Sequence, residues 1–372
     1  MEEHAGQPFI LLDAEESRFH ITLLHETGHM ANDLVAGGRE FDGNSTASIP
    51  HSTAALSDRL TAFREGYAIH LETLAAHVSS DPAIRRRYLH RQAVFGDASE
   101  YFRAASDLTS YSQTLARYDA VRDNQFAFAS AFQGPDYLRV QLEKARDYAQ
   151  LRDANQLLQS EGFYATFFFM LAVRGESVPS EETITLREGQ TLRAMRGMLT
   201  GAKRGDAPWL LDFVCEFMRQ FPDENAAVVD VLNDLSHGVF VDAEAATIWR
   251  EHYLAALRLD FEHLNVKGIA AARKRWREQV LADPRVLFSR LGPEIPCTVR
   301  GTHVKLVVLE SDEPVKFDLN TVPPGILRLI PGITEAEVSA WLAERARKPF
   351  ASVDDFRSRK ALRAETLAGL DM

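Results

Sequence analysis

The chain of 372 residues has a formal net charge of −11 at pH 7, with 45% hydrophobic and 26% charged residues. These values are those of an ordinary globular protein whose core is large enough to need no covalent staples. The acidic balance opposes extended wrapping of nucleic acid, because phosphate contacts require a basic surface. Only two cysteines are present, Cys215 and Cys297, which excludes a disulfide framework and an all-cysteine metal site.

The N-terminus has no basic segment followed by a long apolar run, so we expect no signal peptide and a cytoplasmic location. The longest apolar stretch, Phe163 to Val173, is shorter than the roughly 20 residues that cross a bilayer. It predicts a buried helix, and no membrane span is expected. The first motif begins only 25 residues into the chain, so a leader lost from a longer chain remains an open alternative.

Apolar residues at helical spacing predict a first helix over 15–35. A loop rich in Gly, Ser and Thr follows over 37–56, and because long loops in compact domains are often functional, we expect it to border a cleft. Ser57 is a candidate cap for a helix that ends near residue 79. Further helices are predicted over 82–95, 97–120, 136–150, 153–173, 182–200, 207–220, 224–236, 243–262 and 267–282.

The pattern changes near residue 290, where alternating segments rich in Val and Thr predict two or three short strands. The last fifty residues return to short helices. We therefore predict a mainly α protein with a helical domain over 1–285, a short β connector over 295–318 and a second helical domain over 319–372.

The first helix contains the sequence His25-Glu26-Thr27-Gly28-His29. Residues four apart on a helix lie on the same face, so both imidazoles can bind one metal ion. Glu26 is then placed beside the open coordination position, where zinc lowers the pKa of a bound water and the carboxylate accepts its proton. The pattern predicts a Zn²⁺ site with His25 and His29 as ligands and Glu26 as the general base.

A catalytic zinc needs a third protein ligand, and the sequence "FREGYAIHLE" over residues 63–72 offers one. It resembles the second motif of the gluzincin metallopeptidases, in which a glutamate opens the pattern Glu-Gly-aromatic-Ala-x-aromatic-x-Glu on a separate helix. The matching residues are Glu65, Gly66, Tyr67, Ala68 and Glu72, while His70 stands where an aromatic is usual.

The gluzincin resemblance implies that Glu65 is the third zinc ligand, that the body is zincin-like and that the substrate is a peptide or protein. The gap from His29 to Glu65 is longer than in the aminopeptidase branch that carries this motif most clearly. No counterpart of that branch's substrate-amine motif is present, so aminopeptidase specificity is not implied.

Three further carboxylates are candidates near such a site. Asp58 and Glu161 are alternatives to Glu65 as ligand, although Asp58, two turns from Glu65 on the same face, is better suited to supporting a ligand. Glu161 opens a very apolar helix and either lines the cleft or is simply favoured by the helix dipole. Asp33 continues the histidine face and either orients a ligand imidazole or is an ordinary polar residue near a helix end.

A zinc hydrolase also needs a donor that stabilises the oxyanion in the transition state. The sequence does not rank the candidates, which are Tyr101, Tyr111, Tyr118, Tyr164 and His237.

Residues 317–359 resemble helix-hairpin-helix domains of the competence-protein and type II secretion pseudopilin kind. The resemblance rests on the segment 318–321 (DLNT), the hairpin 331–333 (PGI) and the closing segment 349–356. In DNA-binding members a second glycine follows two residues after the first, whereas here Thr334 occupies that position. The resemblance implies binding of a DNA backbone, docking of a protein partner or a packing role, and the candidate contacts are Gly332, Arg357, Arg359 and Lys360.

Two functions follow from these motifs. The first is a zinc-dependent peptide hydrolase. The alternative is a non-enzymatic binding protein with a structural or degenerate metal site, whose C-terminal module docks a protein partner or DNA. A protease directed to DNA-bound proteins by that module would combine the two.

Overall fold

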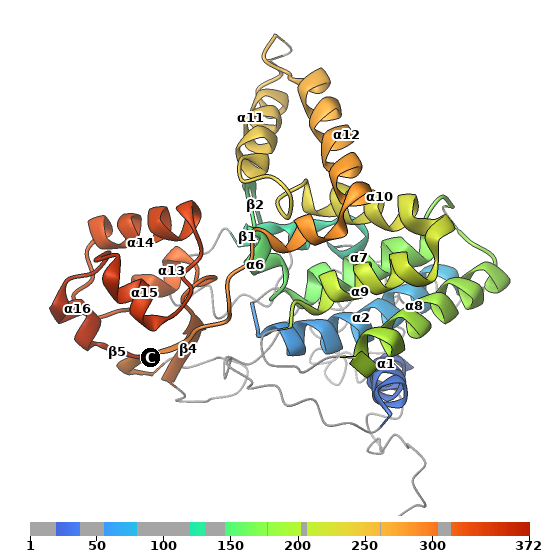
Figure 1. The fold of residues 1–372 in the computed structure, drawn as a ribbon, viewed down its shortest axis with the longest axis horizontal. Helices are drawn as coiled ribbons and strands as arrows, with labels where there is room; N and C mark the ends of the chain where they lie inside the picture. Colours follow the sequence, from blue (N-terminus) through green and yellow to red (C-terminus); the bar gives the residue numbers. More distant parts are fainter. Residues whose placement is uncertain are drawn as a thin grey trace, which may run out of the picture.

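The computed structural model describes residues 20–37, 56–79, 120–130, 146–176, 178–201, 207–260, 262–303 and 314–372. These parts form a mainly helical protein with two small sheets, which confirms the predicted mainly α class (Figure 1). Within them, no helix combines the length and apolar character that crossing a membrane requires.

The helical body is organised around α2 (Arg59–Val78), which packs against α1 on one side and α7 on the other. Helix α1 (His20–Ala36) also contacts α8 (Glu181–Gly201). The neighbouring helices are α7 (Glu161–Val173), α9 (Trp209–Gln220) and α10 (Asn225–Ser236). Large aromatic side chains fill the space between them, and those almost fully buried include Phe63, Tyr67, Phe167, Phe168, Trp209 and Phe213.

Glycines let these helices approach at their backbones. A Cβ atom at Gly28 of α1 would lie 2.6 Å from the Cα atom of Ala68 in α2. A Cβ atom at Gly66 of α2 would lie 2.3 Å from the Cβ atom of Tyr164 in α7. Both distances are too short for any side chain, so α1, α2 and α7 form a closely stacked set.

The helix predicted over 153–173 is in fact two helices, α6 (Ala154–Leu157) and α7. The break lies at Ser160, whose hydroxyl oxygen accepts a hydrogen bond from the Phe163 N–H at 3.3 Å and so caps α7. This is the usual role of serine at a helix start.

The helix predicted over 136–150 is wrong for residues 146–150, which form part of a strand. This strand, β2 (Arg146–Leu151), pairs antiparallel with β1 (Phe128–Ser130), which follows the 3₁₀ turn η2 (Gln125–Ala127). Three predicted segments lie wholly or largely outside the described residues: the helix over 82–95, residues 97–119 of the helix predicted over 97–120, and residues 38–55 of the predicted loop.

Two antiparallel helices project from the body as a hairpin, α11 (Ala245–Leu257) and α12 (Val266–Ala282) (Figure 1). Two 3₁₀ turns complete the body, η3 (Pro222–Glu224) and η4 (Pro284–Phe288).

The C-terminal domain combines a three-stranded antiparallel sheet, in the order β4-β3-β5, with four short helices. The strands are β3 (Pro296–His303), β4 (Pro314–Asp318) and β5 (Leu370–Asp371). The helices are α13 (Pro324–Leu327), α14 (Glu335–Arg347), α15 (Val353–Ser358) and α16 (Ala364–Ala368).

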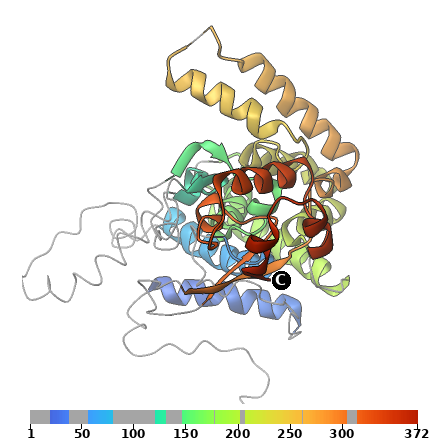
Figure 2. The same ribbon diagram turned by 90° about the vertical axis from the view of Figure 1, so that its left-hand side faces the viewer.

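The strands expected to form a separate connector share one core with these helices. Cys297 and Val299 of β3 are buried in the same cluster as Trp341 of α14 and Phe356 of α15. The last strand of the chain also pairs with β3, with Val299 opposite Leu370. Residues 295–303 and 314–372 therefore form one unit, whose core is distinct from the core of the helical body. Figure 2 shows this unit in front of the body, with the α11–α12 hairpin projecting away from both.

Candidate metal centre

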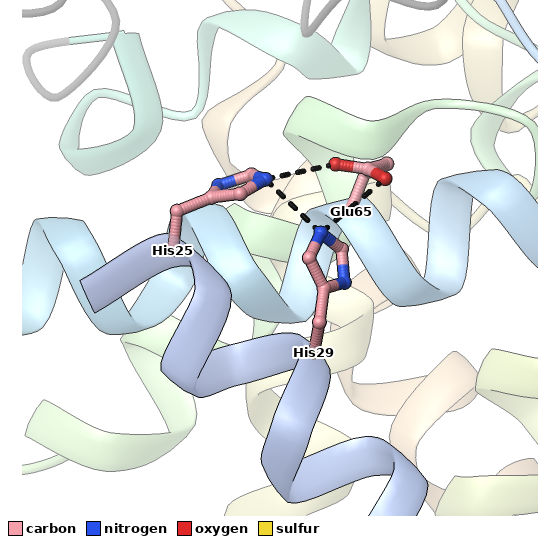
Figure 3. Close-up of side chains that lie close together, drawn as sticks. All are labelled: His25, His29 and Glu65. Carbon is pink, nitrogen blue, oxygen red and sulfur yellow. Dashed lines mark hydrogen bonds and ion pairs between the residues drawn. The ribbon is translucent and has the colours of Figure 1, made fainter. Parts of the chain in front are cut away.

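Three potential metal ligands converge between α1 and α2: His25, His29 and Glu65 (Figure 3). The Nε2 atom of His25 lies 3.1 Å from the Nε2 atom of His29 and 3.1 Å from Oε2 of Glu65. The Nε2 atom of His29 lies 3.5 Å from Oε1 of Glu65. Among the residues that the structure describes, no other three His, Cys, Asp or Glu side chains bring their ligand atoms within 4.8 Å of one another.

These separations fit a single tetrahedral zinc ion. With zinc–ligand bonds of about 2.0–2.1 Å, neighbouring donor atoms lie about 3.4 Å apart. The measured distances of 3.1, 3.1 and 3.5 Å are close to this value. The side chains of His25, His29 and Glu65 are 22%, 20% and 16% exposed, so the cluster has an accessible side for a water or substrate.

The close contact between Gly28 and Ala68 explains how the three side chains meet. His25 and His29 are one turn apart on α1, and Gly28 lies between them on the face that touches α2. Ala68 follows Glu65 by three residues on α2, which places Glu65 beside the point of contact. The short approach of the two helix backbones therefore brings the carboxylate within reach of both imidazoles.

Glu72 supports His25 from the opposite edge of its ring. Oε1 of Glu72 lies 2.6 Å from Nδ1 of His25, and the Glu72 side chain is only 1% exposed. A carboxylate that accepts the second ring N–H fixes the tautomer and orientation of a ligand histidine. Glu72 is not among the site residues predicted from the sequence; the signal for it is its position two turns after Glu65, on the same face of α2.

The ionisation states of His25 and Glu65 depend on each other. Burial opposes ionisation of His25, but hydrogen bonds with Glu65 and Glu72 prevail and raise the pKa of His25 to about 9. Burial likewise opposes ionisation of Glu65, yet hydrogen bonds from His25 and His29 hold the pKa of Glu65 well below its usual value. Near neutral pH, a metal ion must therefore displace a proton from His25.

Glu26 lies on the same helix as both histidines and is half-buried. It precedes His29 by three residues, and residues at this spacing are neighbours on a helix surface. Glu26 is thus a neighbour of His29 on the surface of α1.

Asp33 and Asp58 have other contacts. The exposed Asp33 carboxylate pairs with Nη2 of Arg64 at 3.1 Å. Asp58 caps α2, since its side chain accepts hydrogen bonds from the N–H and the hydroxyl of Thr61 at 2.9 and 2.8 Å. The carboxylate in contact with Nδ1 of His25 is that of Glu72, and orientation of a ligand imidazole by Asp33 stays a prediction.

Glu161 is the first residue of α7 and is 1% exposed. Its backbone carbonyl oxygen would lie 2.7 Å from a Cβ atom at Gly66, so it belongs to the tight α2–α7 contact. The structure therefore associates Glu161 with helix packing.

Two of the five candidates for oxyanion stabilisation are described, and both lie in packed surroundings. Tyr164 is fully buried, and burial raises the pKa of its hydroxyl far above the usual value. The ring of His237 packs against Phe128 and Trp249, and burial lowers its pKa to about 4. Tyr101, Tyr111 and Tyr118 lie outside the described residues.

In the C-terminal domain, the Arg359 side chain is held by several contacts within the domain. Its side chain is 8% exposed and donates hydrogen bonds to the carbonyl oxygens of Lys348 and Pro349 at 2.6 and 3.1 Å. It also pairs with Asp355 at 2.5 Å. Little of the Arg359 side chain is therefore left exposed to a partner, and its role in binding stays a prediction.

The other candidate contacts, Gly332, Arg357 and Lys360, are more accessible to a partner than Arg359. Gly332 has a left-handed backbone (φ +76°) with free space around it, and its carbonyl oxygen accepts a hydrogen bond from Arg363 at 2.8 Å. Lys360 is exposed, as is Arg357, which lies 3.9 Å from Asp354. Several neighbouring cations form ion pairs: Arg328 with Glu335, Arg347 with Glu344 and Arg363 with Glu337. This neutralisation disfavours a phosphate-binding face.

Comparison with known proteins relates the C-terminal domain to one family. A family model described as type II secretion system, protein K, matches residues 317–371. This match is compatible with a protein partner and covers only the end of the chain. No curated protein and no solved structure matches the chain.

Proposed function

We propose that this protein is a zinc-dependent hydrolase of peptide bonds, similar to the gluzincins. The observation that supports the proposal most strongly is the convergence of His25, His29 and Glu65 at separations suited to one zinc ion, on a partly exposed face. The carboxylate of Glu72 behind His25 adds the outer support that ligand histidines in zinc sites usually have.

In this mechanism His25, His29 and Glu65 would hold the ion, which when bound would polarise a water molecule and lower its pKa. Glu26 would act as the general base and accept a proton from the water whose oxygen forms a bond to the peptide carbonyl carbon. When the C–N bond breaks, Glu26 returns the proton to the departing amine. Glu72 accepts the Nδ1–H of His25 and so keeps Nε2 of His25 directed toward Glu65 and His29.

The direct test is hydrolysis of an unfolded protein substrate, such as casein, by Glu26→Gln. Removing a general base costs about 10²- to 10⁴-fold in rate, so we expect a loss of at least about 100-fold with zinc retained. Glu182→Gln, at an exposed position in the first turn of α8, is the matched control and should keep the wild-type rate. Wild-type turnover by Glu26→Gln would refute the proposed mechanism.

A second candidate is a non-enzymatic protein whose C-terminal domain docks a protein partner. The match of residues 317–371 to a secretion-system component and the neutralised cations of that domain favour this reading over DNA binding. It predicts that wild-type protein loaded with zinc cleaves no member of a peptide library. Its DNA version predicts a salt-dependent shift of duplex DNA that is lost when Arg357 and Lys360 are replaced by alanine.

A further inference from the structure

The C-terminal domain and the helical body meet through polar groups. The two hydrophobic cores are separate, and the contact lies at the beginnings of α2 and α7. Because the two buried hydrophobic clusters are separate, the hydrogen bonds and charges at this contact contribute to how firmly the domain is held.

Gln159, just before α7, is the centre of this contact. Its Nε2 donates to Oε1 of Glu294 at 2.9 Å and to Oδ2 of Asp318 at 2.7 Å. Its Oε1 accepts the hydroxyl hydrogen of Thr321 at 2.6 Å. One amide group therefore bridges two carboxylates, and one of these, Asp318, is only 5% exposed.

The same cluster is joined to α2. Oε1 of Glu294 also accepts the backbone N–H of Arg59, the first residue of α2, at 2.9 Å. The guanidinium of Arg59 donates to the carbonyl oxygen of Gly292 at 2.6 Å and to Oδ1 of Asn155 at 3.2 Å. The start of α2 is thus held directly by the segment that leads into the C-terminal domain.

Charged groups of both signs surround the carboxylates of Glu294 and Asp318. Asp58 at the start of α2 adds a negative charge near Glu294, and Arg59 supplies the facing positive charge. Arg345 of α14 and Arg59 are the cations that act on Asp318. When both bridged carboxylates are ionised, they repel each other in poorly solvated surroundings.

We propose that Glu294, Gln159 and Asp318 form a proton-dependent latch, which holds the C-terminal domain more tightly to the start of α2 when one of its two carboxylates is protonated. The latch is a property of the domain contact and does not require a metal. Because α2 carries Glu65 and Glu72, closing the latch would also steady the metal centre, and this consequence rests on the proposed function.

The direction of the pH effect follows from the docked state. Burial raises the pKa of Glu294 to about 7; Asp318 and Asp58 add to the rise, while Arg59 and its backbone N–H oppose it. Burial raises the pKa of Asp318 as well. A free glutamate titrates near about 4.3, so the docked state binds more protons than the undocked one. Docking is therefore strongest in acid and weakens as the pH rises through about 7.

Hydrogen exchange of the full chain in the presence of EDTA tests the latch without involving zinc or substrate. After correction for intrinsic exchange, protection of the segments 56–63 and 292–298 in the wild type should be about tenfold higher at pH 6 than at pH 8. Glu294→Gln imitates the protonated acid, since its remaining oxygen can keep both hydrogen bonds. It should show acid-like protection at both pH values.

Glu335→Gln, which alters an exposed ion pair of the same domain, is the control and should behave as the wild type. Protection of the wild type that is equal at pH 6 and pH 8 would overturn the proposal, and this measurement requires no variant. The same pH dependence in Glu294→Gln as in the wild type would overturn it too. Because metal is absent, neither result depends on whether the centre binds zinc.

Discussion

Oε1 of Glu72 lies 2.6 Å from Nδ1 of His25, on the edge of the imidazole opposite the Nε2 atom that faces Glu65 and His29. Glu65 and Glu72 are seven residues apart, so one face of α2 supplies both the carboxylate in the cluster and the carboxylate behind it. His25 is thereby held at both nitrogens.

Replacing Glu72 should weaken metal binding without removing a ligand. Loss of such an outer carboxylate usually costs about 10- to 100-fold in metal affinity, and we expect a loss in this range for Glu72→Gln, measured by competition with a chelator. Asp33→Asn is the matched control, because Asp33 pairs with Arg64. Equal affinities of Glu72→Gln and the wild type would contradict the role of Glu72.

Zinc affinity should rise with pH. The metal-free protein holds a proton on His25, whose pKa is raised to about 9, and the zinc-bound protein does not. His25 alone should therefore increase the affinity about tenfold for each pH unit between 6 and 8, with the increase ending near pH 9. Calorimetry in two buffers of different ionisation enthalpy should detect about one proton released from His25 per zinc at pH 7. An affinity that is constant from pH 6 to 8 would be inconsistent with this cluster.

The contact between α2 and α7 should not tolerate a side chain at Gly66. In Gly66→Ala the new Cβ would meet the Cβ of Tyr164 at 2.3 Å, and overpacking of this kind costs about 1–3 kcal/mol. Gly189→Ala in α8 is the control, because nothing lies within 4 Å of its Cβ position. It should stabilise the protein by about 0.5–1 kcal/mol through helix propensity. Urea unfolding compares the two, and a Gly66→Ala protein as stable as Gly189→Ala would contradict the close approach.

Replacing Arg359 should destabilise the protein more than replacing Arg357. Arg359→Ala removes hydrogen bonds to two backbone carbonyl oxygens and the ion pair with Asp355, and should cost about 2–3 kcal/mol. Arg357→Ala removes a largely exposed cation and should change stability by less than about 0.5 kcal/mol. Thermal unfolding measures both. Similar effects of the two substitutions would show that Arg359 is not a structural residue.

The sequence was informative where the signal was local. The four-residue spacing of His25 and His29 predicted their common face, and the motif around Glu65 predicted the third member of the cluster. The structure brings these side chains together, and their role as zinc ligands stays a prediction. Ser160 was a readable helix cap that we missed, so α6 and α7 were joined into one predicted helix.

Contacts between distant parts of the chain were beyond local patterns. Residues 146–150 belong to a predicted helix, and only the pairing of β2 with β1 makes them part of a strand. Gln159 bridges Glu294 and Asp318, which follow it in the chain by 135 and 159 positions. No rule of sequence spacing connects residues so far apart. The contact between Glu72 and His25 could not be predicted either, because it depends on how α1 packs on α2.

The central claim is that His25, His29 and Glu65 bind one zinc ion. Native mass spectrometry after loading with zinc and removal of excess metal tests it most directly. The account predicts one zinc per chain in the wild type and in Glu26→Gln, and none in His29→Ala or Glu65→Ala. A wild-type protein without zinc, or a Glu65→Ala variant that retains a full equivalent, would contradict it.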